Sequence, residues 1–168
     1  TVPLPVLVQM LTGVPAQVRE AGQRLRAVSV RCVNLGIARP DVCDKHWIYY
    51  PEEKPIFHRI FVQSNASPHL TPAGCSALTA EISYSPTKPL PATGDALIQR
   101  VIDDCQAVGL LRPSDTIVTA GQVDMPYAYV VPDLQKEAAV AEIQAWLKSH
   151  KIISAGRFGA WQYLNTDH

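Results

Sequence analysis

The residues best suited to contact a ligand gather near the C-terminal end of the sequence. An apolar stretch of β type, residues 152–155, leads into the glycine-framed segment from Gly156 to Gly159. Indole, phenol, amide and carboxylate side chains follow within the next eight residues. A strand that ends in such a glycine-rich turn is one way for a chain to approach a ligand closely. Because no helix follows this turn to receive the ligand, we expect the sequence to be part of a larger protein.

A second candidate cluster contains the tyrosines of H-W-I-Y-Y and the arginine of I-F-H-R-I-F-V-Q. The polar connection P-E-E-K-P between them predicts an antiparallel hairpin with a five-residue loop. Tyr49 or Tyr50 would then lie near Arg59. A guanidinium offers a planar fork suited to phosphate, and a tyrosine adds a ring and a hydroxyl, so the cluster could hold a phosphorylated sugar or nucleotide. The alternative is an ion pair of Arg59 with Glu52 or Glu53, with the tyrosines as ordinary strand residues.

The sequence contains no self-sufficient catalytic or metal-binding motif. Its five histidines lack metal-ligand spacing, and neither a P-loop nor G-x-S-x-G, H-E-x-x-H or G-x-G-x-x-G occurs. The four cysteines lie far apart, which favours core residues in a reducing cytoplasm over a zinc site. Tyr127 and Tyr129 follow a predicted strand at a spacing of two, so both can face one side, as core residues or toward a ligand.

Composition narrows the class of protein and partner. A chain of 168 residues, 47% of them hydrophobic, can form the core of one domain. The net charge is zero with both signs mixed, which argues against nucleic acid and against an anionic membrane surface as partners. We also expect neither a transmembrane segment nor a signal peptide.

Hydrophobic periodicity and turn residues predict an α+β fold. Helices are expected over residues 4–11, 16–26, 95–108 and 134–149. Strands are expected over 27–37, 46–50, 56–63, 75–85, 115–124 and 152–155, with a kinked extended segment at 125–131. Within the third of these strands, alternation places Arg59 on the same face as Phe57 and Phe61. The order predicts a mixed, largely antiparallel sheet with helices packed on one face.

Three segments resemble flavin-dependent oxidoreductases of the amine oxidase and protoporphyrinogen oxidase type. They are Y-Y-P-E-E-K-P-I-F-H-R-I-F-V-Q-S-N-A-S-P (Tyr49 to Pro68), Y-A-Y-V-V-P-D (Tyr127 to Asp133) and G-R-F-G-A-W-Q-Y-L-N-T-D-H (Gly156 to His168). Within that group they are most similar to UDP-galactopyranose mutases, especially the eukaryotic type, and to related flavoproteins. The order and spacing of these segments agree with the family from Val28 onward.

The resemblance implies a division of labour along the chain. Residues 1–151 would form a substrate-binding domain, and residues 152–168 would be the strand and turn that return to an FAD-binding domain. The complete protein would then be an FAD-dependent oxidoreductase or a mutase-like enzyme acting on a small molecule such as a nucleotide sugar. The chain alone is expected to be inactive and to hold FAD weakly, and surfaces exposed by truncation would favour self-association.

The same resemblance assigns residues to the two ligands. The substrate-binding residues would be Tyr49, Arg59, Asn65, Tyr127, Tyr129 and Tyr163. The cofactor-binding residues would be Gly156, Arg157, Phe158, Gly159, Trp161 and Asn165. Arg59 would lie on the diphosphate of the nucleotide sugar, and Arg157 beside the flavin and the substrate. No metal is expected, and the catalytic groups stay unassigned because the family's FAD-binding motif is absent from this sequence.

Two other interpretations stay open. The chain could be a stand-alone module that binds a nucleotide sugar or a protein partner without catalysis. It could also be a structural domain that assembles with another chain. A G-x-G-x-x-G motif after a strand, upstream in the reading frame, would favour the flavoenzyme over both.

Overall fold

The computed structural model describes residues 2–165, and the chain divides into two compact units. Unit 1 comprises Thr1–Val28 and Pro126–His168, and unit 2 comprises Ser29–Met125. The chain enters unit 2 within strand β1 and leaves it within strand β5. This division concerns compactness alone, so the functional boundary expected between residues 151 and 152 stays a prediction.

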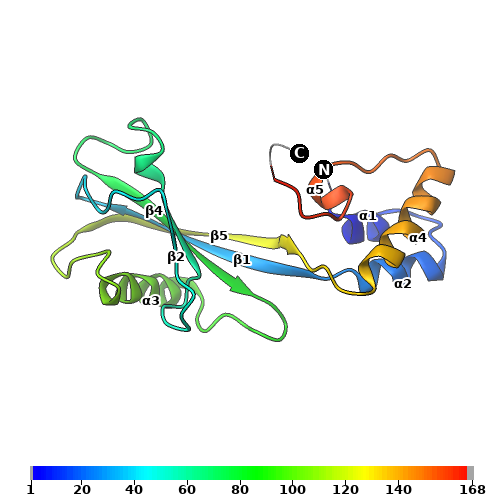
Figure 1. Ribbon diagram of the computed structural model, residues 1–168, viewed down its shortest axis with the longest axis horizontal. Helices are drawn as coiled ribbons and strands as arrows, with labels where there is room; N and C mark the ends of the chain where they lie inside the picture. Colours follow the sequence, from blue (N-terminus) through cyan, green and yellow to red (C-terminus); the bar gives the residue numbers. More distant parts are fainter. Residues whose placement is uncertain (1, 166–168) are drawn as a thin grey trace. The chain divides into compact units, whose positions relative to one another are not determined.

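Unit 2 is built on a five-stranded sheet in the order β2-β3-β4-β1-β5 (Figure 1). Its strands are β1 (Ala27–Ile37), β2 (Trp47–Tyr49), β3 (Arg59–Val62), β4 (Ser76–Tyr84) and β5 (Ile117–Val130). The pairs β2–β3, β3–β4 and β4–β1 are antiparallel. The sheet is antiparallel throughout, and the predicted α+β class is confirmed.

The core of unit 2 lies between one face of this sheet and helix α3 (Gly94–Ala107). Leu97, Val101 and Cys105 recur at helical spacing and are fully buried. They belong to one cluster with the alternating apolar residues of the strands, which are Val33, Leu35, Ile37, Ile60, Val62, Leu78, Ala80 and Ile82. Gly109, with φ of +75°, ends the helical region in the left-handed conformation that glycine adopts without strain.

Unit 1 is mainly helical. Its helices are α1 (Leu4–Met10), α2 (Ala16–Arg24), α4 (Lys136–Ser149) and α5 (Gly156–Gly159). Helix α2 packs against α4, where Arg24 Nη2 lies 2.9 Å from Glu142 Oε2. Leu4, Val8, Ala21, Ile143, Leu147 and Trp161 form its fully buried centre.

Three predictions about elements need correction. Residues 152–155 do not form a strand, because β-type side chains make a strand only beside a partner, and Ile153 is 93% exposed. Gly156 to Gly159 is a short helix rather than a turn, with Ala160 N donating to Gly156 O at 2.8 Å. The segment 125–131 continues β5 to Val130, and Pro126 is tolerated there because β5 is an edge strand.

Close approach of β5 explains the glycine at position 36 of β1. A Cβ atom at Gly36 would lie 2.7 Å from Thr119 Cγ2, whereas one at Gly121 would meet nothing within 4 Å. We expect Gly36→Ala to lower the free energy of unfolding by about 1–3 kcal/mol because of this overlap. Urea denaturation should show no such loss for Gly121→Ala, and adding Thr119→Ala should restore most of it. Equal effects of the two glycine substitutions would contradict this account.

A buried ion pair fixes the end of β1 to the chain that precedes β5. Arg39 donates to Asp115 through Nε (2.9 Å to Oδ1) and Nη2 (2.8 Å to Oδ2). The same guanidinium donates to the carbonyl oxygens of Asp41 and Leu110, and Asp115 accepts from Arg112 N at 2.8 Å. The hydrogen bond from Arg39 holds the pKa of Asp115 below its ordinary value of 3.8.

We expect Asp115→Asn to lower the free energy of unfolding by about 2–3 kcal/mol, because it leaves a buried guanidinium without its counterion. Since the pKa of Asp115 is depressed in the folded state, its contribution is present above about pH 4 and lost as the pH falls below that value. The stability curves of the two proteins should therefore converge in acid. Asp44→Asn, which removes an exposed carboxylate, is the control and should leave stability unchanged.

Candidate functional site

A row of side chains crosses four strands of unit 2 on the face opposite helix α3. The register pairs Tyr49 with Arg59, Arg59 with Glu81, and Glu81 with Cys32. Side chains alternate along a strand, so the neighbours of these residues point into the core while the row does not. The next row on this face is Trp47, Phe61, Thr79 and Asn34. We call these two rows the polar face.

Arg59 lies at the centre of the polar face. Its Nη2 donates to both carboxylate oxygens of Glu81, at 2.7 and 2.6 Å, and its Nη1 lies 3.4 Å from Tyr49 Oη. The guanidinium carbon is 4.5 Å from the ring centre of Trp47 and 5.7 Å from that of Tyr49. Trp47 in turn stacks on Phe61 at 4.2 Å. The cation is thus held by a carboxylate and framed by aromatic rings.

The predicted neighbourhood of Tyr49 and Arg59 is therefore confirmed in this structure, but the predicted alternative partner of Arg59 is wrong. The arginine pairs with Glu81, not with Glu52 or Glu53. Sequence reasoning missed Glu81, although a carboxylate in the middle of the apolar strand A-L-T-A-E-I-S-Y was a usable signal.

Two titratable side chains beside Glu81 are held neutral. Burial, and then the charge of Glu81, raise the pKa of Cys32 to about 11, so its thiol stays protonated at neutral pH. Burial is also the main cause that lowers the pKa of His58, whose Nε2 lies 3.9 Å from Glu81 Oε2. The polar face therefore offers no thiolate nucleophile, and its charges are those of Arg59 and Glu81.

Asn65 lies in the short helix η1 (Gln63–Asn65), after β3. Its Nδ2 donates to the carbonyl oxygens of Cys43 and Lys45, both at 2.9 Å. The amide donors therefore stabilise the chain leading into β2, which favours a structural role over the predicted substrate contact.

Unit 1 contains a second arginine held in an aromatic environment. Arg157 of α5 donates through Nη1 to Leu164 O at 3.1 Å and through Nη2 to Ala128 O at 2.9 Å. Three ring centres lie 4.7, 5.4 and 5.7 Å from its guanidinium carbon, those of Tyr163, Phe158 and Tyr129. The structure thus brings together four of the residues predicted to bind substrate or cofactor.

The other predicted residues of unit 1 have different surroundings. Trp161 is fully buried and Tyr127 meets it edge-on, so both belong to the core of the unit. Gly156 has φ of +77°, where α5 begins. A Cβ at Gly159 would lie 2.8 Å from the Ser154 hydroxyl, which explains the glycine there by close packing. Asn165 is exposed.

Two buried N–H groups near this arginine have no hydrogen-bond acceptor among residues 2–165. They are Arg157 Nε and the indole Nε1 of Trp161. Trp161 also has φ of +52°, a conformation that is unusual for a bulky residue. Buried donors without an acceptor are costly, so the surroundings of Arg157 are those of a group that would gain from an additional ligand.

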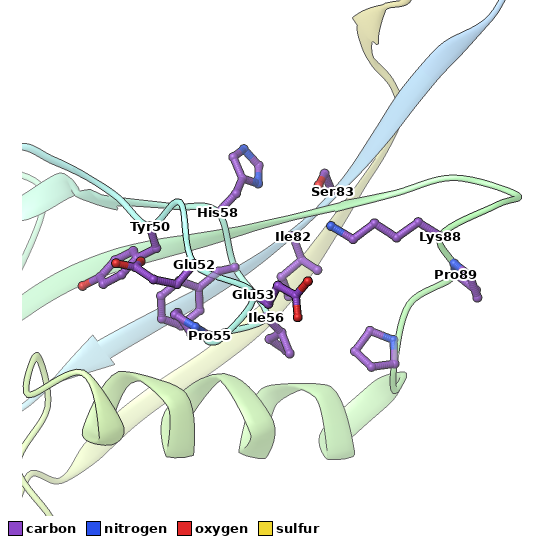
Figure 2. A pocket seen from close by; sticks show the side chains of 12 residues that line it. Tyr50, Glu52, Glu53, Pro55, Ile56, His58, Ile82, Ser83, Lys88 and Pro89 are labelled. Carbon is purple, nitrogen blue, oxygen red and sulfur yellow. The ribbon is translucent and has the colours of Figure 1, made fainter.

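A separate pocket of about 260 Å³ lies in unit 2 beside the β2–β3 connection (Figure 2). Its lining residues are Tyr50, Glu52, Glu53, Pro55, Ile56, Phe57, His58, Ile82, Ser83, Lys88, Pro89 and Pro91. It carries charged groups of both signs, and Tyr50 of the predicted tyrosine cluster lines it, whereas Tyr49 and Arg59 do not.

Two absences hold for the part of the chain that the structure describes. No group of three or more histidine, cysteine, aspartate or glutamate side chains is placed to hold a metal ion. No helix there has the length and apolarity required to cross a membrane.

No family model matches the sequence, but the chain is similar to a number of solved structures, two of which are described below. The chain is similar to the crystal structure of a reduced UDP-galactopyranose mutase, with 30% identity and a TM-score of 0.86 over 97% of this chain and 36% of that one. It is also similar to a putative protoporphyrinogen oxidase from Exiguobacterium sp. 255-15, with 14% identity and a TM-score of 0.66 over 89% of this chain and 33% of that one.

The chain therefore spans about a third of the length of both solved structures. The likeness at 14% identity shows the fold alone. Both relatives come from the groups of proteins that the three sequence segments resembled, so the predicted resemblance is confirmed.

Proposed function

We propose that this chain forms the substrate-binding part of a flavin-dependent enzyme of the UDP-galactopyranose mutase kind. The observation that carries the proposal is the match over 97% of the chain to a UDP-galactopyranose mutase at 30% identity. Within that fold, the register sets Tyr49 beside Arg59, the two residues to which the sequence resemblance assigns the nucleotide sugar. The activity is proposed for the complete enzyme, of which this chain alone is expected to be an inactive part.

On the substrate side, Arg59 would bind the diphosphate of a nucleotide sugar. Its planar guanidinium is suited to phosphate oxygens, and the hydroxyl of Tyr49 lies close enough to share a phosphate with it. The exposed ring of Tyr49 and the ring of Trp47 add apolar surface next to the cation. A ligand that combines a diphosphate with sugar and base rings suits this mixture of charge and ring surface.

On the cofactor side, the surroundings of Arg157 fit a flavin. They combine a cation, the rings of Tyr163 and Phe158, and a buried N–H of Arg157 that lacks an acceptor among the described residues. Arg157 would lie beside the flavin, with Tyr163 and Asn165 following it. FAD would supply the redox or nucleophilic chemistry when bound, and Arg157 would offset negative charge on it.

The reaction class is proposed from the same comparisons. The 30% identity to a mutase, against 14% to a putative oxidase, favours a sugar-nucleotide mutase over a related oxidoreductase.

A cytoplasmic location is proposed because all four cysteines are free. Self-association of the isolated chain is proposed because Leu134 and Ile153 are almost fully exposed.

The flavin is tested on the complete protein, expressed from its full reading frame. We expect it to co-purify with flavin at close to one per chain, because the cofactor performs the chemistry in this kind of enzyme. The absorbance spectrum and the flavin released on denaturation measure this ratio. A colourless protein that cannot be reconstituted with FAD would contradict the proposal and favour a binding module without catalysis.

The substrate class is tested with Arg59→Ala in the same protein. Loss of a charge-assisted contact to the diphosphate should weaken UDP-galactopyranose binding about thirtyfold to a hundredfold, measured by calorimetry. Because the substitution leaves Glu81 without its counterion, thermal melting must first show that the variant is folded. Arg100→Ala removes an exposed arginine of α3 and is the charge-matched control. Unchanged affinity in a folded Arg59 variant would exclude the nucleotide-sugar assignment.

A further inference from the structure

Glu81 is the least expected member of the polar face. Its side chain is only 9% exposed, which is unusual for a carboxylate. Both of its carboxylate oxygens accept from the same nitrogen of Arg59, at 2.7 and 2.6 Å. A buried carboxylate is costly to desolvate, so its ion pair with Arg59 adds little net stability.

We propose that Glu81 is a positioning and specificity residue for the diphosphate site. It holds the guanidinium of Arg59 in place and cancels its charge, so that the site favours a nucleotide sugar over a simple inorganic anion. This inference rests on the proposed function of Arg59 in binding a nucleotide sugar.

The positioning role follows from the geometry of the contacts. Arginine donors occupy a rigid plane, so fixing Nη2 on Glu81 also fixes the direction of Nη1. The rings of Trp47 and Tyr49 restrict the same guanidinium at 4.5 and 5.7 Å. The edge next to Tyr49, which is 65% exposed, is then the side on which a phosphate oxygen can accept a hydrogen bond from Arg59. The arginine is oriented before the ligand arrives, which lowers the entropy lost on binding.

The specificity role follows from the charges. The pair contributes no net charge, and its two neighbours Cys32 and His58 are held neutral. A phosphate on Arg59 would therefore feel the repulsion of Glu81 at close range. One unit charge about 6 Å away changes the affinity for an anion by about threefold to a hundredfold, for effective dielectric constants of 80 to 20. Affinity must then come also from ring contacts, which the sugar and base of a nucleotide sugar make and inorganic pyrophosphate lacks.

The test compares two ligands, pyrophosphate and UDP-galactopyranose, in the complete protein. Glu81→Gln keeps a hydrogen-bond acceptor for Arg59 and removes the negative charge. We expect its affinity for pyrophosphate to rise about tenfold at low salt, and this gain to shrink as salt screens the charge. The preference for UDP-galactopyranose over pyrophosphate should fall accordingly. Glu142→Gln, which neutralises the carboxylate paired with Arg24, is the matched control and should change neither affinity.

A folded Glu81→Gln protein with unchanged or weaker pyrophosphate binding would overturn the inference. If that variant does not fold, Arg59→Gln is compared with the double variant Arg59→Gln, Glu81→Gln, in which both partners are neutral. The double variant should bind pyrophosphate more tightly than the single one, and equal affinities would also overturn the inference. Failure of the unmodified protein to bind UDP-galactopyranose would instead refute the proposed function. Normal binding that is lost in Arg59→Ala, without a gain in Glu81→Gln, would refute only the role of Glu81.

Discussion

The register of β3 against β4 is the constraint on which unit 2 depends. Pairing Arg59 with Glu81 and Ile60 with Ala80 places the apolar residues against helix α3 and the polar residues on the opposite face. A slip of one residue would bring the guanidinium toward the core and Ile60 onto the polar face. The same hydrophobic pattern that stabilises the sheet therefore assembles the candidate ligand site, without any separate loop to position it.

Two arginine–carboxylate pairs of unit 2 differ in their surroundings. Arg39 and Asp115 also hydrogen-bond backbone groups of the surrounding loops, so this pair fixes those loops at the end of the β1–β5 pairing. Arg59 and Glu81 lie within a sheet whose backbone groups are already paired. Apolar residues at these two positions would hold the strands together equally well. The charged pair is therefore better explained by what it offers a ligand than by the stability it adds.

The sequence predicted those features that depend on local signals. The bounds of β1 were predicted correctly because alternation and Pro40 mark them. Helix α3 was predicted to within one residue at each end because Gly109 ends its apolar periodicity. Residues 152–155 were expected to form a strand because their side chains are of β type. That prediction was wrong because strand pairing is non-local, and side-chain type alone does not supply a partner. Phe57 was placed on the face of Arg59, yet it is 1% exposed because β3 begins only at Arg59 and alternation does not extend before it. Glu81 was not predicted as the partner of Arg59, because the register of β3 against β4 cannot be derived from the sequence of either strand alone.

Under the proposed function, the two arginines of the candidate sites would be prepared for different ligands in different ways. Both are framed by aromatic rings, but Arg59 is neutralised by a carboxylate, whereas Arg157 donates to two backbone carbonyls. A carbonyl orients a guanidinium without cancelling its charge, so, as far as residues 2–165 are concerned, the Arg157 cluster stays cationic and the Arg59 cluster is balanced. A cationic cluster suits a cofactor that gains negative charge during the reaction. A balanced one suits a substrate that must be recognised by shape as well as charge, and must also leave after each turnover.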